Sequence, residues 1–466
     1  MSNSKLEEFK RYIRNRKVAF IGIGVSNIPA MKYLSKMGAN VTGFDKKTYQ
    51  ELGDICIELE SMGIGLSLGE KYLETLMGYD VIFRSPTVRP DMIQIQRELK
   101  MGAILTSEIE MVMKMCPGTI IGVTGSGGKT TTSTLIYNML NEQGKDCYLG
   151  GNIGVPLFDK IEEMNEDTIV VLELSSFQLM TMNKSPHIAV MTSLAPDHLD
   201  IHTSLEEYYD AKTNIFKYQN EDDILILNYD NEILREYIPK AKGRVRLYSQ
   251  TTKLDTGVII ADEKIKIANN KVRRHIIDCN EIAMVGKYNQ MNLCAAVLAT
   301  DGIVDIENVA KVARTFTGVH HRMELVAVKD KVKYINNSIA SSPIKSITSI
   351  QDIEQKIILL AGGYDKHVDF EDFAKTIIEK AKVVFLFGET KYKIKEAIDR
   401  QLQEINSSLE VVMCDNFDIA TKKAIDYAVE GDMVILSPGC ASFDEFKDYQ
   451  ERGNRFKEII ESYQKE

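Results

Sequence analysis

The stretch TIIGVTGSGGKTTT, residues 119–132, decides the fold. Its first half, 119–124, is rich in β-branched and aliphatic residues and is typical of a buried strand, whereas Gly125, Gly127 and Gly128 interrupt it before a helix-like run. Such a turn directs backbone N–H groups, and the positive end of the helix, toward one point where a phosphate can bind. The stretch therefore predicts an α/β domain with a phosphate-binding loop.

Within this loop, Lys129 is placed to reach the outer phosphates of a nucleotide, and the Thr130 hydroxyl to coordinate Mg2+. The common pattern has a further glycine where this chain has Val123, so the loop is of a shorter type. A plain glycine turn with a solvated lysine is the alternative, but the succession of strand, glycines, Gly-Lys-Thr and helix favours phosphate. The predicted phosphate-binding residues are Thr124, Gly125, Ser126, Gly127, Gly128, Lys129, Thr130 and Thr131.

The chain of 466 residues is too long for one ordinary hydrophobic core, so we expect two to four domains. Its composition, 44% hydrophobic and 27% charged, is that of a globular protein, and no apolar run approaches the ~20 residues that span a bilayer. A net charge of -10 disfavours a general nucleic-acid or membrane-surface binder. The seven cysteines form no CxxC pair, which disfavours a zinc site and a disulfide framework. We expect a cytoplasmic monomer that binds neither nucleic acid nor membrane, although composition does not determine the oligomeric state.

Strand-like and helix-like segments alternate along most of the chain, which indicates βαβ units and largely parallel sheets. The predicted strands besides that of the phosphate loop are 18–24, 40–44, 80–85, 103–106, 168–176, 187–195, 223–228, 332–337, 356–363, 383–389, 410–415 and 432–439. Short segments between 244 and 278 predict antiparallel hairpins instead. We therefore predict three α/β domains: a Rossmann-like domain over 1–107, a central P-loop ATPase-like domain with a mostly parallel sheet over 108–317, and a Rossmann-like domain over 318–466.

A second glycine-rich segment, GIGVSN (22–27), follows the first predicted strand. Asn27 takes the place of the third glycine of the dinucleotide-binding pattern, and Asp45 ends the next strand, where an acidic residue can meet a ribose hydroxyl. An NAD site, a UDP site and a plain tight turn all remain open on these residues.

Glu173 ends the apolar run VVLEL, where a buried carboxylate is costly unless it is paired or bound to a metal. Parallel strands meet ligands at their carboxyl ends, so Glu173 can lie beside the phosphate loop and take Mg2+ together with the loop's threonine. The next strand leads into SLAPDHLDIH (193–202), in which Asp200 and His202 fit a polar loop with a helix cap. Lys212, on the helix that follows, is by itself typical of a solvated surface charge.

Taken together, these motifs resemble those of the Mur ligase family, the ATP-dependent amino-acid ligases of peptidoglycan assembly. The order of the motifs is similar to that family's from one end of the chain to the other. The motifs are TGSGGKTT (124–131), GGNIG (150–154), LELSSFQL (172–179), PDHLDIH (196–202) with Ala211-Lys212, GKYNQMN (286–292), TFTGVHHRME (315–324), LLAGGYDK (359–366) and SPGCASFDEFKDYQERG (437–453). The last is the most discriminating, and it resembles the members that add D-glutamate.

The resemblance implies that ATP phosphorylates the free carboxylate of UDP-N-acetylmuramoyl-L-alanine, and that the amine of D-glutamate then displaces phosphate to form an amide, in cytoplasmic synthesis of peptidoglycan precursors. It implies catalytic roles for Lys129, Glu173, His198 and Lys212. Of two expected Mg2+ ions, Thr130 and Glu173 would hold one, and His198 with a carbamylated Lys212 would serve the other. Charge accumulates on phosphoryl oxygens in such a reaction, so the lysine and Mg2+ would supply most of the stabilisation.

The resemblance also assigns ligand-binding residues by position. Asn289, Asn292, Arg322 and Asn337 would contact the ATP nucleotide, with His321 beside it at the hinge to the third domain. The residues implied for the two other substrates are Val25, Ser26, Asp45, Ser85, Asn152 and His198 for the UDP-substrate, and Lys366, Ser442, Phe443 and Tyr449 for D-glutamate.

The chain departs from the family pattern at several positions. Asn337, Ile339 and Ser341 replace the usual Asp, Lys and Thr, and Gly127 stands where Asn is usual. Three alternatives stay open. One is a related ligase that adds another amino acid or resembles folylpolyglutamate synthase, and another is an ATPase without ligase chemistry. The third is a nicotinamide dehydrogenase built on GIGVSN, which leaves the Gly-Lys-Thr loop unexplained.

Overall fold

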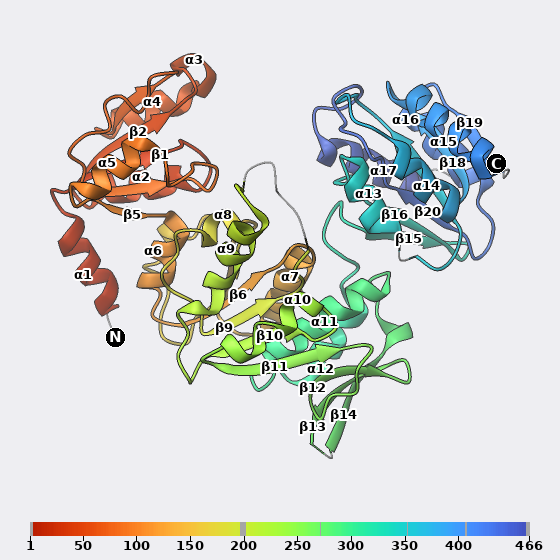
Figure 1. Cartoon of the computed structure of the whole chain (residues 1–466), viewed down its shortest axis with the longest axis horizontal. Helices are drawn as coiled ribbons and strands as arrows, with labels where there is room; N and C mark the ends of the chain where they lie inside the picture. Colours follow the sequence, from red (N-terminus) through yellow and green to blue (C-terminus); the bar gives the residue numbers. More distant parts are fainter. Residues whose placement is uncertain (1–2, 196–201, 271, 352, 406–407, 463–466) are drawn as a thin grey trace. The chain divides into compact units, whose positions relative to one another are not determined.

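The computed structural model describes residues 3–195, 202–270, 272–351, 353–405 and 408–462. The chain forms two compact units: residues 1–276 with 291–312, and residues 277–290 with 313–466. Within the described residues the strands form three sheets, and helices flank each of them (Figure 1). The α/β class is confirmed, and each sheet lies in a different one of the predicted domains, whose boundaries at 107/108 and 317/318 stay predictions.

The first sheet is parallel and has the strand order β3-β2-β1-β4-β5. Phe20 of β1 stacks on Phe83 of β4, with 4.5 Å between the ring centroids, in the buried centre of the sheet. The strand order reverses between β1 and β4, so the loops after these strands meet at the carboxyl edge, where such sheets bind ligands. The elements are α1 (Ser4–Ile13), β1 (Lys17–Ile21), α2 (Asn27–Lys36), β2 (Asn40–Asp45), α3 (Tyr49–Leu52), α4 (Asp54–Ser61), β3 (Gly65–Leu68), β4 (Val81–Arg84), α5 (Ile93–Lys100), β5 (Ile104–Thr106) and α6 (Glu108–Met115).

The second sheet has the order β14-β13-β12-β11-β10-β9-β6-β8-β7, and neighbouring strands are parallel from β12 to β7. The predicted hairpin is confirmed for β12 and β13, whereas β11 extends the parallel part. The elements up to the middle of this part are β6 (Thr119–Thr124), α7 (Lys129–Glu142), β7 (Cys147–Gly151), η1 (Phe158–Lys160), β8 (Ile169–Glu173), α8 (Ser176–Leu179), β9 (Ile188–Met191), α9 (Leu205–Lys217) and β10 (Ile224–Asn228). They continue with α10 (Glu232–Arg235), η2 (Ile238–Lys240), β11 (Arg244–Ser249), β12 (Thr256–Ala261), β13 (Lys264–Asn269), β14 (Val272–Asp278), η3 (Cys279–Glu281), α11 (Lys287–Thr300) and α12 (Ile306–Thr315).

The third sheet has the order β15-β16-β20-β17-β18-β19, in which β15 alone is antiparallel to its neighbour among the described strands. β17 is buried along its whole length, because apolar clusters cover both faces of the sheet. The loops after β17 and β20 meet at the carboxyl edge. The elements are β15 (Glu324–Lys329), β16 (Val332–Asn336), α13 (Pro343–Ile350), β17 (Ile357–Gly362), α14 (Glu371–Lys380), β18 (Ala381–Phe387), α15 (Lys391–Ile405), β19 (Glu410–Met413), α16 (Phe417–Tyr427), β20 (Met433–Leu436) and α17 (Tyr449–Ser462).

Two expectations from composition can be compared with this fold. The seven cysteines are all free, in agreement with the prediction that they form no disulfide framework. Among the helices in the described ranges, none combines the length and the apolar character needed to cross a bilayer.

Candidate functional site

The phosphate loop connects β6 to α7 and is held in shape by the residues after β9. Gly125 has a φ of 154°, and a Cβ there would lie 2.0 Å from Thr192 Oγ1, so only glycine fits. Gly127 N donates a hydrogen bond to Ser193 Oγ at 3.0 Å. Gly128 precedes α7 and makes no side-chain cap, so the first amides of the helix stay directed at the loop. The predicted order of strand, turn and helix is confirmed.

Lys129, the first residue of α7, folds back over its own loop. Its Nζ donates hydrogen bonds to the carbonyl oxygens of Gly125, at 2.9 Å, and Ser126, at 3.2 Å. The threonines around the loop, Thr124, Thr130 and Thr131, are buried. The ammonium group therefore lies where a phosphate would arrive, on carbonyl oxygens that it can exchange for phosphate oxygens.

Glu173 lies beside the phosphate loop: it ends β8, and its register partner on β6 is Val123. The residue is 1% exposed, and Oε1 accepts a hydrogen bond from Asn152 Nδ2 at 2.8 Å. Oε2 is buried and has no hydrogen-bond partner among the described residues. Burying a carboxylate oxygen without a partner costs free energy unless a cation binds to it. The position therefore fits Mg2+ held by Glu173 and Thr130. In the described part of the chain no group of three or more His, Cys, Asp or Glu side chains is arranged to hold a metal ion, so hydroxyl, phosphate or water oxygens would be needed as further ligands.

Lys212 is not the solvated surface charge that its local sequence suggests, since it is 2% exposed. Its Nζ donates a hydrogen bond to Gly125 O at 2.9 Å and lies 4.8 Å from the centroid of the Tyr208 ring. The Tyr208 hydroxyl is in turn 2.9 Å from Ser126 Oγ. Helix α9 therefore contacts the phosphate loop through two side chains. His198, the predicted partner of Lys212, lies outside the described residues.

His202 makes structural contacts, but it is buried and is not the cap of α9, so the predicted polar loop with a helix cap holds for the nearby Ser204 only. Its Nε2 is 2.9 Å from Ser176 Oγ, its Nδ1 is 3.3 Å from Glu207 Oε2, and its ring stacks on Phe177 with 4.9 Å between centroids. The cap of α9 is Ser204, whose side chain accepts a hydrogen bond from Glu207 N. Asp200 is beyond the described residues.

A cavity of about 480 Å³ opens at the carboxyl edge of the first sheet, between the loops after β1, β2 and β4. Gly22 has to be glycine here, because a Cβ on it would lie 2.6 Å from Ser85 Oγ. Asp45 accepts hydrogen bonds from Ile23 N at 2.7 Å and from Lys47 N at 2.9 Å, so it ties two of these loops together. The lining residues are Gly22, Asp45, Lys46, Tyr72, Ser85, Thr87, Val88, Arg89 and Met92.

Five of the six residues predicted for the UDP-substrate divide into three groups, and the sixth, His198, lies outside the described residues. Asp45 and Ser85 line the cavity, whereas Val25 and Ser26 are exposed on the loop after β1 and do not belong to its lining. Asn152 directly follows β7 of the second sheet, and its side chain donates to Glu173. The sequence predicts no role for Tyr72, Thr87, Arg89 and Met92, although the last three closely follow the predicted strand 80–85.

Asn289 and Asn292, two of the residues predicted to contact the ATP nucleotide, lie on α11, one in each compact unit. Asn292 is 3% exposed, and its Oδ1 accepts a hydrogen bond from Thr132 Oγ1 of α7 at 3.4 Å. Asn289 belongs to the second unit, where its Nδ2 donates to Val285 O at 2.8 Å. Asn292 therefore contacts the helix that begins at the phosphate loop.

Asn337 is engaged inside the second unit. It is 1% exposed, its Nδ2 donates to Ser437 Oγ at 3.0 Å, and its Oδ1 accepts from Met323 N at 3.3 Å. Ser437 donates its own proton to Ser346, at 3.0 Å between the two oxygens, so an amide suits position 337 better than the usual carboxylate. Arg322, the residue before Met323, is half-buried.

Three of the residues predicted for D-glutamate gather at the carboxyl edge of the third sheet. Lys366 Nζ lies 5.8 Å from the centroid of the Phe443 ring, and Ser442 beside it is 2% exposed. Tyr449 begins α17, where its ring meets His321 edge-on, with 6.0 Å between centroids. Burial lowers the pKa of His321, which favours a neutral imidazole there.

Arg452, which lies within the motif of residues 437–453 but has no predicted role, holds these loops in place. It is 0% exposed, and its guanidinium donates to the carbonyl oxygens of Cys440 and Ala441, each at 3.0 Å, and of Ser338 at 2.9 Å. Desolvation lowers its pKa to about 10. Because these carbonyls belong to the loops after β16 and β20, Arg452 fixes both of them to α17.

Comparison with known families adds to this geometry. Residues 123–300 match the Mur ligase middle domain, and residues 321–440 match the Mur ligase, glutamate ligase domain. The UDP-N-acetylmuramoylalanine–D-glutamate ligase of Clostridium novyi is 48% identical over 453 residues, which are 97% of this chain and 98% of the relative. The protein of the same name from Acetivibrio thermocellus is 46% identical over 99% of both chains.

Two solved structures share the fold at low sequence identity. The UDP-N-acetylmuramate-alanine ligase MurC of Thermotoga maritima gives a TM-score of 0.55 at 18% identity, over 96% of this chain and 99% of that one. The MurF ligase of Thermotoga maritima in complex with ADP gives a TM-score of 0.55 at 17% identity, over 97% of this chain and 96% of that one. The likeness concerns the fold, and it extends over all three sheets.

Proposed function

The chain belongs to the Mur ligase family, whose members are ATP-dependent ligases that form amide bonds, and from this premise we propose that it adds D-glutamate to UDP-N-acetylmuramoyl-L-alanine. The names of its full-length relatives support this pair of substrates. The observation that carries the proposal is the buried Glu173 carboxylate in register with the strand of a phosphate loop that holds Lys129. Together these groups can neutralise the charge of a phosphoryl group in transfer.

The proposed reaction has two steps. The γ-phosphate of ATP passes to the free carboxylate of the substrate, which gives an acyl phosphate and ADP. The amine of D-glutamate then attacks the carbonyl carbon, and the tetrahedral intermediate collapses to the amide with loss of phosphate. Lys129 would exchange the carbonyls of Gly125 and Ser126 for phosphate oxygens as negative charge builds on them.

Thr130 and Glu173 would hold one Mg2+, which supplies neutralisation of phosphate charge when bound. His198 and Lys212 would serve a second, with Lys212 carbamylated. The burial of Lys212 against Gly125 supports this assignment, since it puts the side chain at the phosphate loop and away from solvent. A carbamate would turn this cation into an anion suited to a metal.

We assign the three ligands to the carboxyl edges of the three sheets. The cavity of the first sheet, with Asp45 and Ser85, would take the UDP part of the substrate. The remaining assignments are Val25, Ser26 and Asn152 for the same substrate, Asn289, Asn292, His321, Arg322 and Asn337 for ATP, and Lys366, Ser442, Phe443 and Tyr449 for D-glutamate. We also propose that the enzyme acts as a monomer in the cytoplasm, where its nucleotide substrates would be available.

A phosphate-release assay across amino acids tests the proposed function. With ATP, Mg2+ and UDP-N-acetylmuramoyl-L-alanine, we expect release with D-glutamate and not with L-glutamate or L-lysine. The variant Lys129→Ala should lose about 100-fold in rate, because a charge-stabilising donor at the transferred phosphoryl group is removed. Release with L-glutamate or L-lysine alone would instead indicate a ligase for another amino acid. Release without the UDP-substrate would indicate an ATPase.

A further inference from the structure

An ion pair joins the wall of the nucleotide cavity to helix α9. Arg89, which lines the cavity, donates from Nη2 to Glu207 Oε1 at 2.9 Å and from Nη1 to Glu207 Oε2 at 3.3 Å. On its other side the same guanidinium contacts Asp91. Both side chains of the pair are 27% exposed, so the contact lies at the border between cavity and protein interior.

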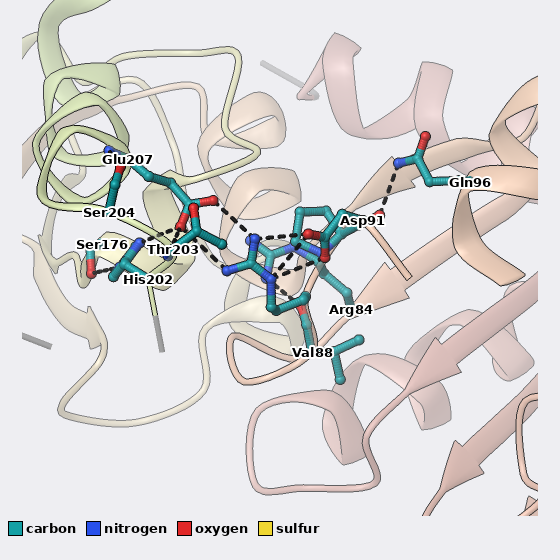
Figure 2. A network of polar contacts seen from close by, with 11 residues as sticks. Arg84, Val88, Asp91, Gln96, Ser176, His202, Thr203, Ser204 and Glu207 are labelled. Atoms are coloured by element: carbon teal, nitrogen blue, oxygen red, sulfur yellow. Dashed lines mark hydrogen bonds and ion pairs between the residues drawn. The ribbon is translucent and has the colours of Figure 1, made fainter. Parts of the chain in front are cut away.

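Glu207 also organises the start of α9. Its Oε2 accepts a hydrogen bond from Thr203 N at 2.7 Å and lies 3.3 Å from Nδ1 of His202, whose Nε2 contacts Ser176 (Figure 2). The guanidinium of Arg89, together with these bonds, lowers the pKa of Glu207 to about 2, so the pair stays ionised at neutral pH. The first turn of α9 is therefore fixed to the cavity wall by a charged, multiply bonded contact.

The same helix contacts the phosphate loop within its next turn. Tyr208 meets Ser126 through the two hydroxyls at 2.9 Å, and Lys212 Nζ donates to Gly125 O at 2.9 Å. Residues 207–212 of α9 thus contact both the cavity wall, through Glu207, and the phosphate loop, through Tyr208 and Lys212.

A separate buried contact holds the two parts together. Arg84 is 1% exposed and donates to Val88 O at 3.0 Å (Figure 2), to Thr181 Oγ1 at 3.0 Å and to Phe177 O at 2.5 Å. Since Arg84 supplies this structural tie, Arg89 can be changed without freeing the loop after β4 from helix α8.

We propose that Arg89 and Glu207 form a positioning pair that couples occupancy of the nucleotide cavity to the phosphate loop through α9. A ligand that orders the cavity wall also orders Arg89, and with it the helix that sets Gly125 and Ser126. By thermodynamic linkage, each of the two ligands then binds more tightly in the presence of the other. The inference rests on the proposed function, which assigns a sugar nucleotide to the cavity and ATP to the loop.

Titration calorimetry with the full chain tests this pair. The quantity measured is the Kd of a non-hydrolysable ATP analogue with Mg2+, without and with saturating UDP-N-acetylmuramoyl-L-alanine. For the unmodified protein we expect the Kd to fall by about tenfold on adding the sugar nucleotide, a typical size for such coupling. In Arg89→Met and Glu207→Gln the ratio of the two Kd values, without and with the sugar nucleotide, should fall to less than about twofold. The Kd of the analogue alone should change by less than about threefold. Arg89→Lys, which keeps the charge but loses the paired hydrogen bonds, should restore part of the ratio.

A matched control breaks a different ion pair, between the residues that directly precede β1 and β4. Arg16 pairs with Asp80 at 3.1 Å, outside the cavity lining, and Arg16→Met should leave the ratio unchanged.

A purely structural role for Arg89 would lower thermal stability and weaken the binding of both ligands without changing the ratio, and that result overturns the inference. So does a ratio near one in the unmodified protein, or an unchanged ratio in Glu207→Gln, which serves if Arg89→Met does not fold. If the sugar nucleotide does not bind the unmodified protein at all, the proposed function itself is contradicted.

Discussion

At the scale of single residues, Glu173 shows how a site can be built at the expense of stability. Its carboxylate is buried with one hydrogen bond from Asn152, and its second oxygen has no partner among the described residues. A neutral amide is cheaper to bury than a carboxylate in this state. The same burial would strengthen the binding of a metal ion and the phosphates of ATP, because opposite charges attract more strongly away from water.

The variant Glu173→Gln separates these two effects. Without Mg2+ it should be as stable as the unmodified protein or more stable, by up to about 1–2 kcal/mol, because a buried charge is removed. Its rate of phosphate release should fall by about 100-fold and its Mg2+ requirement should rise. Thermal unfolding in a chelator and assays across Mg2+ concentrations measure both effects. The exposed Glu166→Gln is the control, and activity of Glu173→Gln within threefold of normal would contradict the metal assignment.

The position of Glu173 could be predicted from the sequence, whereas the surroundings of Lys212 and Arg452 could not. Glu173 ends an apolar strand next to a recognisable loop, and parallel pairing brings such strand ends together. The burial of Lys212 depends on how α9 lies over the loop, and that of Arg452 depends on carbonyls from two segments more than 90 residues apart. Neither arrangement leaves a periodic pattern in the sequence.

At the scale of secondary-structure elements, α6 contains a carboxylate that makes stability depend on pH. Glu108 is in the first turn of α6 and 7% exposed, and its Oε1 accepts a hydrogen bond from Leu157 N at 3.3 Å. Burial raises its pKa from 4.5 to about 7. The folded state therefore holds the proton more tightly than the unfolded state does. The resulting stabilisation is full below pH 4.5 and is lost as the pH rises through 7.

Glu108→Gln should remove this dependence. Relative to the variant, the unmodified protein should lose stability between pH 4.5 and 7, by at most about 3 kcal/mol. Urea unfolding of both proteins at pH 5 and pH 8 measures the difference, with the variant more stable at pH 8 than the unmodified protein. An equal difference at the two pH values would show that Glu108 does not titrate in this range.

The strands that the sequence did not predict share a physical reason. β3, β7 and β15 are each at the edge of a sheet, and most of their residues are only partly buried. An edge strand has one neighbour and a half-solvated surface, so it lacks the continuous apolar run of a central parallel strand. The central strands β1, β6, β8, β17 and β20 are almost entirely buried, and their apolar runs predicted them within a few residues.

At the scale of the whole molecule, each sheet presents its carboxyl edge to a different proposed ligand. The cavity belongs to the first sheet, the phosphate loop to the second, and the contact of Lys366 with Phe443 to the third. The strand, glycine turn and helix of residues 119–132 predicted the phosphate site of the second sheet, whereas the resemblance to the Mur ligase family implied the ligands of the other two sheets. The ties between the first two sheets were not predicted, because Arg84 contacts Phe177 and Arg89 contacts Glu207, residues far from them in the chain.

The central claim is that ATP activates the substrate carboxylate as an acyl phosphate, and transfer of an oxygen isotope tests it most directly. UDP-N-acetylmuramoyl-L-alanine labelled with oxygen-18 in its carboxylate is incubated with ATP, Mg2+ and D-glutamate, and the released phosphate is analysed by mass spectrometry. We expect each phosphate to carry one labelled oxygen from the carboxylate, in an amount equal to the amide formed. Unlabelled phosphate, or phosphate released without amide, would contradict it.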